Sequence, residues 1–316
     1  MYSPAEMQPA RARVRDSGTR LDQNSWRRWW RRLGARAVSG ISGVLGSSPR
    51  LRGLALRSLL DAHMAPDVLC RVPFGDHTLY VDPRDDKIAL KLLAGRPWQR
   101  RELETSIATL REAGRLRPDG LFIDVGANIG AQTVYAMRSG AFAGAVAIEP
   151  DPHNFEILER NLIVNGLTDR VQAIAAAASA ASGRLRLVRH GKNQGAHSVE
   201  VAFVSKPAGE LEVPAATLDE ITQGLGISPD QVALVKIDVE GHELSVLKGM
   251  AELRRASVPI LVELTANPAD AARMDTVKSL LLKNYGQVLV VGTKQFSPFP
   301  LRALALQEFQ SDLLVF

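Results

Sequence analysis

Short apolar runs alternate with helical segments over most of the chain after residue 120, and this alternation constrains the fold more than any other feature. Each run has the length of one strand and is apolar nearly throughout, as in strands that are buried on both faces. The runs are LFIDV (121–125), AVAIE (145–149), VQAIA (171–175), ALVKIDV (233–239), PILVEL (259–264), QVLVVG (287–292) and SDLLVF (311–316). Strands that alternate with helices form right-handed βαβ units. We therefore expect an α/β fold with a doubly wound, mainly parallel sheet.

Helical periodicity and turn residues define the segments between these runs. We expect helices over residues 86–95, 99–113, 132–139, 154–165, 244–253 and 269–283. Residues 68–82 have the pattern of a hairpin around the turn Gly75-Asp76. Two further runs, LRLV (185–188) and VEVAFV (199–204), indicate an antiparallel excursion from the main sheet.

The net charge is distributed unevenly along the chain. The whole chain carries +5, whereas residues 1–57 hold twelve arginines, no lysine and three acids, a net of +9. The remaining residues therefore carry 5 − 9 = −4. We interpret residues 1–60 as a basic, partly disordered tail that includes one amphipathic helix, and residues 61–316 as the globular domain.

The amphipathic helix of the tail is predicted over residues 26–39. Trp26, Trp30 and Leu33 recur on one side, and most of the neighbouring arginines fall outside that stripe. Two interpretations stay open: the helix binds an anionic membrane surface, or it docks on the globular domain or on a second subunit. Neither a spanning segment nor a signal peptide is evident, and Cys70 is the single cysteine. We expect a cytoplasmic protein, peripheral on the inner face of the membrane in the first case, and the oligomeric state is not predicted.

The first chemical motif is Asp124-Val125-Gly126-Ala127-Asn128-Ile129-Gly130, which ends the first strand of the alternation and opens a helix. Open α/β sheets bind ligands at this position. Gly126 and Gly130 leave room for a tight turn and a close ligand, and Asp124 offers a carboxylate to a cationic or amine-bearing ligand. The GxxxG spacing differs from the GxGxxG of dinucleotide binders and favours S-adenosylmethionine, which has no pyrophosphate. The alternative is an ordinary strand-to-helix turn.

The second motif is Glu149, which ends the next strand of the alternation. A carboxylate at this position can accept hydrogen bonds from both hydroxyls of a ribose. Burial at the end of a strand would be costly for a carboxylate without such a partner. The alternative is a structural acid at the edge of the sheet.

The third motif is Lys236–Glu243, where acids and an imidazole follow a buried strand. Asp238, Glu240 and His242 can hold an amine, orient a hydroxyl or take its proton. Alternatively, Glu240 and His242 only cap the helix that follows. Glu263 ends the neighbouring strand, and it is either catalytic or a structural neighbour.

The order of these motifs resembles the FkbM family of S-adenosylmethionine-dependent methyltransferases. The matching segments are FIDVGANIG, AIEPDPHNFEILERN, TLDE, VKIDVEGHE and PILVEL, within residues 99–265. The resemblance implies a class I methyltransferase (Rossmann-like) fold of about seven strands with the last one antiparallel. It also implies S-adenosyl-L-methionine as the cofactor and O-methylation of hydroxyls on sugars or natural products.

The resemblance also implies roles for individual residues. Four residues would line the methionine and ribose part of the cofactor: Asp124, Gly126, Asn128 and Gly130. Glu149 would bind the ribose diol, and Asn154 would lie nearby. Asp238 would contact both the cofactor and the reaction zone. Asp238, Glu240 and His242 would face the methyl that is transferred, with His242 as the expected base. We interpret Asn193–Ser198 as part of the acceptor pocket and His197 as a solvent-exposed loop residue. No metal site is expected, because no ligand cluster has suitable spacing.

The acceptor is expected to be a small molecule or a glycan. A nucleic-acid methyltransferase is the main alternative, because the arginines of the tail could contact phosphates. However, the chain lacks both a DPPY- or NPPY-type motif and a Pro-Cys nucleophile, so nucleic acid is not the expected partner. A second alternative is a methyltransferase fold that has lost catalysis and only binds ligands, and the intact acids of the three motifs argue against it.

Overall fold

The computed structural model describes residues 68–191, 193–265, 271–293, 297–305 and 310–316. The predicted tail at residues 1–60, including its amphipathic helix, lies outside the described residues, so the interpretations of that helix stay predictions. Within the described ranges, no helix has the length and apolar character needed to cross a bilayer.

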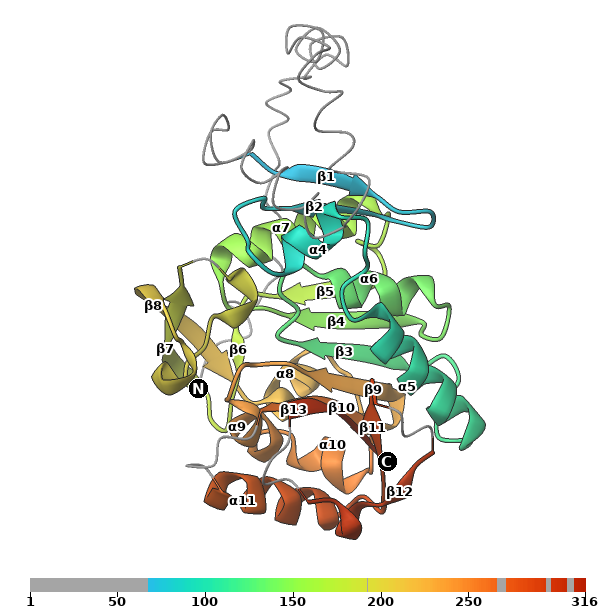
Figure 1. The fold of residues 1–316 in the computed structure, drawn as a ribbon. Helices are drawn as coiled ribbons and strands as arrows, with labels where there is room; N and C mark the ends of the chain where they lie inside the picture. Colours follow the sequence, from blue (N-terminus) through green and yellow to red (C-terminus); the bar gives the residue numbers. More distant parts are fainter. Residues whose placement is uncertain (1–67, 192, 266–270, 294–296, 306–309) are drawn as a thin grey trace, which may run out of the picture.

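The described residues form one large mixed sheet of eight strands (Figure 1). Its order is β12 (Phe299–Pro300), β11 (Gln287–Val291), β13 (Gln310–Val315), β10 (Ile260–Thr265), β9 (Val232–Ile237), β3 (Leu121–Val125), β4 (Gly144–Ile148) and β5 (Val171–Ile174). The strands from β10 to β5 are parallel, whereas β13 lies antiparallel between β10 and β11. The expected class I methyltransferase fold is therefore confirmed, and the two-residue β12 adds one strand to the seven expected.

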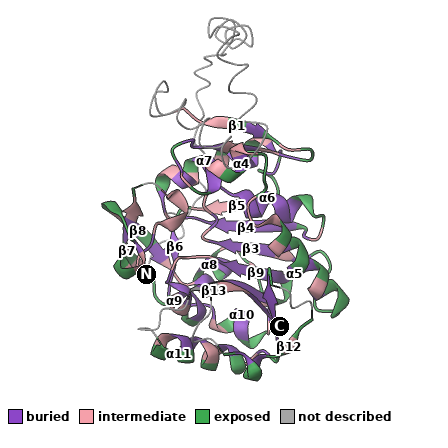
Figure 2. Cartoon of the chain, in the orientation of Figure 1, coloured by how far each residue is buried: buried purple, intermediate pink, exposed green. Residues whose placement is uncertain are grey.

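Helices cover both faces of this sheet, because successive side chains of each buried strand point to opposite sides. One face packs against α4 (Ile88–Leu93), α5 (Arg100–Glu112), α6 (Ala131–Arg138) and α7 (Pro152–Val164). The other face packs against α8 (Leu218–Gly224), α9 (Glu243–Lys248), α10 (Ala251–Arg255) and α11 (Ala271–Leu282). In β3, Phe122 belongs to the first apolar layer and Ile123 to the second. The sheet is therefore the buried centre of the molecule, as Figure 2 shows.

The predicted antiparallel excursion is present, but one of its strands was assigned to the wrong residues. A small sheet has the order β6 (Ala177–Ala178), β8 (Pro207–Ala216) and β7 (Gly183–His190). LRLV lies in β7, whereas VEVAFV contains the 3₁₀ turn Val201–Phe203 and no strand. This segment turns because Phe203 packs onto Gly241, where an added Cβ would lie 2.5 Å from the ring. The true partner strand, β8, begins with exposed residues that hide it from an apolar pattern.

One predicted helix, residues 244–253, is divided into α9 and α10 in the structure. The break falls at Gly249, where a Cβ would lie 1.9 Å from the carbonyl oxygen of Ser179. The close contact between these two backbones therefore interrupts the helix. The predicted hairpin is confirmed as β1 (Cys70–Pro73) paired antiparallel with β2 (Thr78–Val81).

A side chain of α7 fixes the hairpin beside the glycine motif. Asn161 Oδ1 accepts a hydrogen bond from the Tyr80 amide at 2.5 Å. Its Nδ2 donates to the carbonyl oxygens of Tyr80 at 3.1 Å and Ile129 at 2.7 Å. Because Asn161 is fully buried, these bonds hold β2 in one position relative to the turn after β3.

Candidate active site

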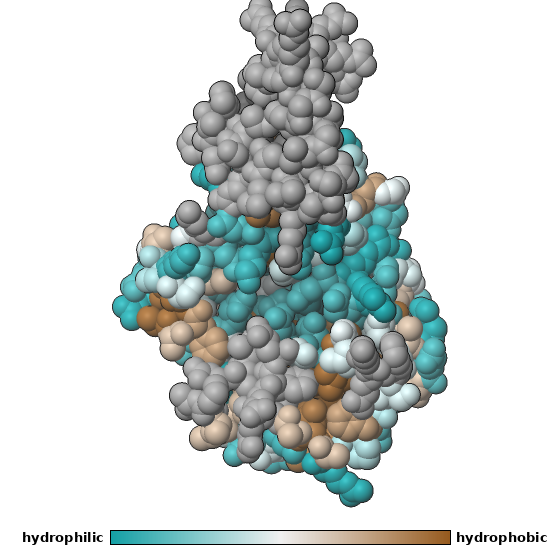
Figure 3. Space-filling model, viewed as in Figure 1, coloured by the Kyte–Doolittle hydropathy of each residue, from teal (hydrophilic) through white to brown (hydrophobic). Residues whose placement is uncertain are grey.

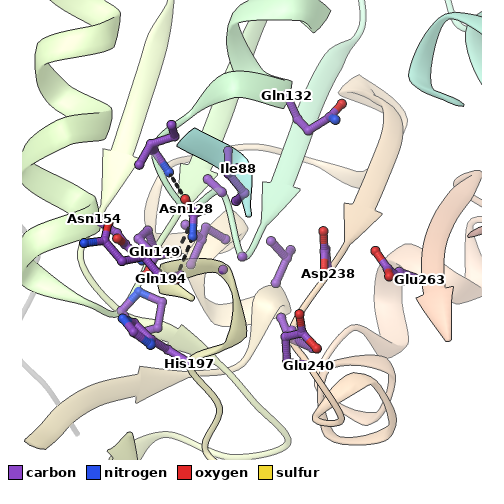
Figure 4. Close-up of a pocket in the computed structure, with 18 of the residues that line it drawn as sticks. Ile88, Asn128, Gln132, Glu149, Asn154, Gln194, His197, Asp238, Glu240 and Glu263 are labelled. Atoms are coloured by element: carbon purple, nitrogen blue, oxygen red, sulfur yellow. Dashed lines mark hydrogen bonds between the residues drawn. The ribbon is translucent and has the colours of Figure 1, made fainter. Parts of the chain in front are cut away.

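A cavity of about 420 Å³ lies at the carboxyl ends of the parallel strands, where open α/β sheets bind ligands. The turns after β3, β4 and β9 line it, together with α4 and the segment that links α4 to α5. The face of the molecule drawn in Figure 3 is mainly hydrophilic across its middle. Figure 4 shows two groups of side chains in the cavity. We call Asn128, Glu149, Asn154, Gln194 and His197 the amide end, and Asp238, Glu240 and Glu263 the acidic end.

The glycine motif lets the turn after β3 approach its neighbours closely. Gly126 has φ +80°, and a Cβ there would lie 1.9 Å from the carbonyl oxygen of Asp238. Gly130 has φ +78°, and a Cβ there would lie 2.3 Å from Leu158 of α7. The two glycines therefore bring the turn after β3 against the turn after β9 and against α7, which joins the two ends of the cavity.

Asp124 lies beneath the cavity and does not line it, which corrects its expected place at the edge of the sheet. The residue is fully buried, and its Oδ2 accepts a hydrogen bond from Thr133 Oγ1 at 2.6 Å. Its Oδ1 has no hydrogen-bond partner among the described residues. Burial raises the pKa of this carboxyl, although the nearby Lys236 opposes the shift. Asp124 therefore supports the turn from below.

Glu149 lies at the amide end, as predicted. Its Oε2 accepts from the Asn128 amide and its Oε1 from the Asp151 amide, both at 2.9 Å. Burial raises the pKa of Glu149 to about 8 despite these bonds. In its carboxylate form each oxygen has a second lone pair, so both oxygens can still accept a hydrogen bond from a hydroxyl. The arrangement suits a ribose diol.

The carbonyl oxygen of Gln194 joins two predicted cofactor residues. It accepts hydrogen bonds from Asn128 Nδ2 at 2.9 Å and from Asn154 Nδ2 at 3.0 Å. The side chain of Gln194 reaches the other way and donates to Asp82 Oδ2 at 2.8 Å. The segment Asn193–Ser198, expected in the acceptor pocket, therefore also forms a wall of the amide end.

His197 is not the solvent-exposed loop histidine that was expected. Only 10% of its side chain is exposed, and the ring lines the cavity. Its Nδ1 accepts a hydrogen bond from the His190 amide at 3.0 Å. Burial lowers the pKa of His197 to about 4, so the ring is neutral near pH 7. The difference arises because the next residue, Ser198, pairs with Val188 of β7 and so holds this loop against the small sheet.

At the acidic end, Asp238, Glu240 and Glu263 line the cavity together (Figure 4). Asp238 Oδ2 accepts a hydrogen bond from the buried Lys236 Nζ at 3.0 Å. Glu263 Oε2 accepts from Gln99 Nε2 at 3.1 Å. The structure thus brings the two predicted acids together with the one whose role was left open.

Mutual repulsion and burial make this end reluctant to hold its full negative charge. The Asp238 charge, followed by burial, raises the pKa of Glu263 to about 8. Burial, followed by the Asp238 charge, raises the pKa of Glu240 to about 7. Burial also opposes the charged form of Lys236, but Asp238 and Asp124 outweigh it and raise the pKa of the ammonium. A bound positive charge would relieve the repulsion.

His242 lines the cavity, but both of its ring nitrogens contact other side chains. Nε2 lies 2.9 Å from Ser179 Oγ, and Nδ1 lies 2.8 Å from Glu200 Oε1. The side chain is 9% exposed. In this arrangement His242 connects the end of β6 and the turn region after β7 to the loop that carries Glu240, and both nitrogens are in contact with protein side chains.

Sequence reasoning missed Gln99 and Gln132 among the polar residues that line the cavity. It included Gln194 in the expected acceptor pocket and Lys236 in the third motif, but it gave neither residue a role of its own. A second feature marks the site as well. Gln99, Asn128 and Glu240 have positive φ values of 48°, 51° and 47°, which side chains other than glycine rarely adopt. Such strained residues concentrate at functional sites. No pattern in the sequence announces them.

The cavity suits S-adenosylmethionine by two observations. Three amide oxygens in its lining, Gln99 Oε1, Gln132 Oε1 and Asn154 Oδ1, are buried without a hydrogen-bond partner among the described residues. They can accept hydrogen bonds from the amines and hydroxyls of a ligand. Residues 176–178 are all alanine and line the cavity after β5, so an adenine ring would meet apolar surface there. The acids of the other end suit a cation.

Comparison with known proteins also identifies this chain as a methyltransferase. Residues 124–289 match the model of the methyltransferase FkbM domain. Methyltransferase sdnD of Sordaria araneosa is 29% identical over 168 residues, which are 45% of this chain and 64% of that protein, so the match spans just under two thirds of the relative. Hexuronic acid methyltransferase AglP of Haloferax volcanii is 28% identical over 194 residues, 56% of this chain and 72% of AglP.

A third relative is 31-O-demethyl-FK506 methyltransferase FkbM of Streptomyces tacrolimicus. It is 29% identical over 177 residues, which are 48% of this chain and 67% of that protein. The family model covers more than half of the chain and contains Gly126, Glu149, Asp238 and Glu263. The chain therefore belongs to the FkbM family of methyltransferases, for which S-adenosylmethionine is the methyl donor.

Proposed function

We propose that this protein transfers the methyl group of S-adenosylmethionine to a hydroxyl of a sugar, a glycan or a natural product. The observation that supports this most directly is the single cavity that joins the amide end to the acidic end. The first end offers acceptors for a nucleoside, and the second offers carboxylates for a cation and for a hydroxyl proton. Two relatives are named for hexuronic acid and for 31-O-demethyl-FK506, which are oxygen-rich acceptors.

Cofactor binding is assigned to the glycine turn and to the amide end. Gly126, Gly130 and Asn128 shape the turn, Glu149 holds the ribose diol, and Asn154 lies beside it. Asp124 supports these residues from beneath, and Asp238 faces the methionine part. S-adenosylmethionine supplies a methyl group on a positively charged sulfur. The residues of the chain need to align the acceptor oxygen with that methyl.

Within the reaction zone, Asp238 and Glu240 are proposed to face the acceptor. His242 was the expected base, but its contacts with Ser179 and Glu200 favour a positioning role for it. Because the ring ties together two segments that line the cavity, its loss would displace Glu240.

Transfer of labelled methyl groups tests this function. The full chain is incubated with methyl-labelled S-adenosylmethionine and a panel of uronic acid glycosides, neutral glycosides and macrolides that carry free hydroxyls. We expect one class of hydroxyl to gain label, and the Glu149→Ala variant to gain none. Binding of S-adenosylmethionine without transfer to any hydroxyl, or labelling of RNA instead, would contradict the proposal.

A further inference from the structure

Methylation of a hydroxyl requires a group that takes its proton, and a base must be held within hydrogen-bond reach of that proton. Both ring nitrogens of His242 are already in contact with other side chains. Asp238 is paired with the buried ammonium of Lys236 at 3.0 Å, so its negative charge is already partly compensated within the protein. The carboxylate of Glu240 has no hydrogen bond among the described residues that would hold its orientation. The remaining carboxylate of the acidic end is Glu263.

Glu263 has the fixed orientation that a base needs. It lies in β10, in register with Asp312 of β13. Its Oε2 accepts a hydrogen bond from Gln99 Nε2, and its Oε1 is left for a ligand because no described residue bonds to it. Gln99 itself is held at φ 48° immediately before α5, and its own Oε1 is buried without a partner. The hydrogen bond from Gln99 therefore fixes one oxygen of this carboxyl. The carboxyl lies in the lining of the cavity on the same side as Asp238 and Glu240 (Figure 4).

We propose that Glu263, oriented by Gln99, takes the proton of the acceptor hydroxyl, and that the positive charge of the bound methyl donor makes it able to do so. This inference rests on the proposed function, and it assigns the base of the same site.

The charges around Glu263 explain why the bound methyl donor makes this carboxyl able to take a proton. Asp238 and Lys236 face it from β9 and the turn after it, Asp312 from β13, and Glu240 and Glu102 from the other walls of the cavity. Repulsion from Asp238, then burial, raises its pKa to about 8. Glu263 is therefore mostly protonated at pH 7 and cannot act as a base. A cation at the acidic end compensates Asp238 and favours the carboxylate form.

The protons and electrons balance. Glu263 loses its proton to solvent when the cation binds. During transfer the acceptor oxygen forms a bond to the methyl carbon, the carbon–sulfur bond breaks, and its electron pair remains on sulfur. Glu263 takes the proton that the oxygen loses. The sulfur is then neutral, so Glu263 returns to the protonated form that it had before.

Calorimetry measures the loss of the Glu263 proton on binding of the methyl donor, and it needs no acceptor. S-adenosylmethionine, and separately S-adenosylhomocysteine, which lacks the sulfonium charge, is titrated into the full chain in buffers of different protonation enthalpy, at a pH just below the value of about 8 for Glu263. We expect proton release with the cation and much less with the neutral product. Glu263→Gln should bind both compounds but release fewer protons than the wild type when S-adenosylmethionine binds, whereas the matched Glu240→Gln should release nearly as many as the wild type. Equal release by Glu263→Gln and the wild type would overturn the proposal.

Turnover measures methyl transfer with removal of the hydroxyl proton, using the acceptor that the labelling panel identifies. We expect kcat of Glu263→Gln to fall by ~10²–10⁴ and the rising limb of the pH profile to disappear. Gln99→Asn tolerates the positive φ but is too short to reach Glu263, so kcat should fall while KM for the acceptor changes little. A Glu263→Gln variant with a normal rate and pH profile would refute this inference alone. A wild-type chain that fails to bind S-adenosylmethionine would refute the proposed function instead.

Discussion

The two ends of the cavity are built on opposite principles. At the amide end, hydrogen bonds between backbone and side chains hold Asn128, Glu149 and Asn154 in place, with the Gln194 carbonyl between them. At the acidic end, Asp238, Glu240 and Glu263 repel one another and have few hydrogen bonds. The first end is organised before a ligand arrives. The second end becomes favourable only when a positive charge arrives.

This difference indicates that cofactor binding and the reaction depend on different residues of the same cavity. Interactions that are the same before and during the reaction determine affinity, whereas interactions that change with charge determine rate. We therefore expect substitutions at the amide end to change mainly the affinity for S-adenosylmethionine. Substitutions at the acidic end should change mainly turnover and its pH dependence.

The largest effect is expected where the two ends meet. Gly126→Ala would place a Cβ 1.9 Å from the Asp238 carbonyl oxygen, at φ +80°. Because backbone cannot move away cheaply, we expect loss of S-adenosylmethionine binding in calorimetry and a large fall in the melting temperature. Gly140→Ala is the control: its φ is +67°, but nothing lies within 4 Å, so only the strain of ~1–2 kcal/mol applies. Equal behaviour of the two variants would contradict contact between the ends.

A pair of substitutions compares the two ends directly. Glu149→Gln leaves the Asn128 or Asp151 amide facing an NH₂ group, which costs ~1–3 kcal/mol and should raise the Kd for S-adenosylmethionine by about 10–100-fold. Glu240→Gln removes no hydrogen bond among the described residues and should change that Kd much less while lowering kcat. Similar Kd values for the two variants would contradict the expectation that the amide end determines affinity and the acidic end determines turnover.

The order of elements could be predicted from sequence because buried strands have a simple pattern. LFIDV and ALVKIDV are apolar on both faces, and the structure places them at the centre of the sheet. The strand β8 could not be found in this way, because most of its first residues are exposed. VEVAFV alternates as a strand does, but contact with Gly241 turns it into part of the site wall.

The candidate site was predictable where chemistry coincides with the end of a strand. Glu149, Asp238 and Glu240 line the cavity as expected, since each lies within three residues after the end of a buried strand. Gln99 could not be recognised, and Gln194 was expected only as part of the acceptor pocket, because their roles depend on contacts with Glu263 and Asp82, which lie more than a hundred residues away in the chain. Tertiary contacts of this kind have no local signal in the sequence.

The pH dependence of stability measures how strongly repulsion and burial together disfavour the carboxylate form of Glu263. Glu263 has a raised pKa of about 8 in the folded protein, against an ordinary value of 4.5. The folded state therefore holds a proton that the unfolded chain has lost, so this carboxyl lowers stability as pH rises from about 4.5 to 8. Thermal melts across that range should show a shallower decline for Glu263→Gln, by at most ~1.4 kcal/mol per pH unit. The exposed Asp230→Asn should leave the slope unchanged, and an unchanged slope for Glu263→Gln would contradict the raised pKa of this carboxyl.

The smallest effect is expected from Gln194→Ala, which tests how far the amide end depends on its outer support. The substitution keeps the carbonyl that binds Asn128 and Asn154 but removes the side-chain bond to Asp82. A hydrogen bond to a charged acceptor contributes ~1.5–3 kcal/mol at most, and Asp82 keeps Arg84 and His153 as partners, so we expect the Kd for S-adenosylmethionine to rise about fivefold. Gln223→Ala, on the exposed face of α8, is the matched control. If the substitution instead lowered kcat at unchanged Kd, the loop Asn193–Ser198 would belong to the acceptor side, and the boundary between the two ends would have to be moved.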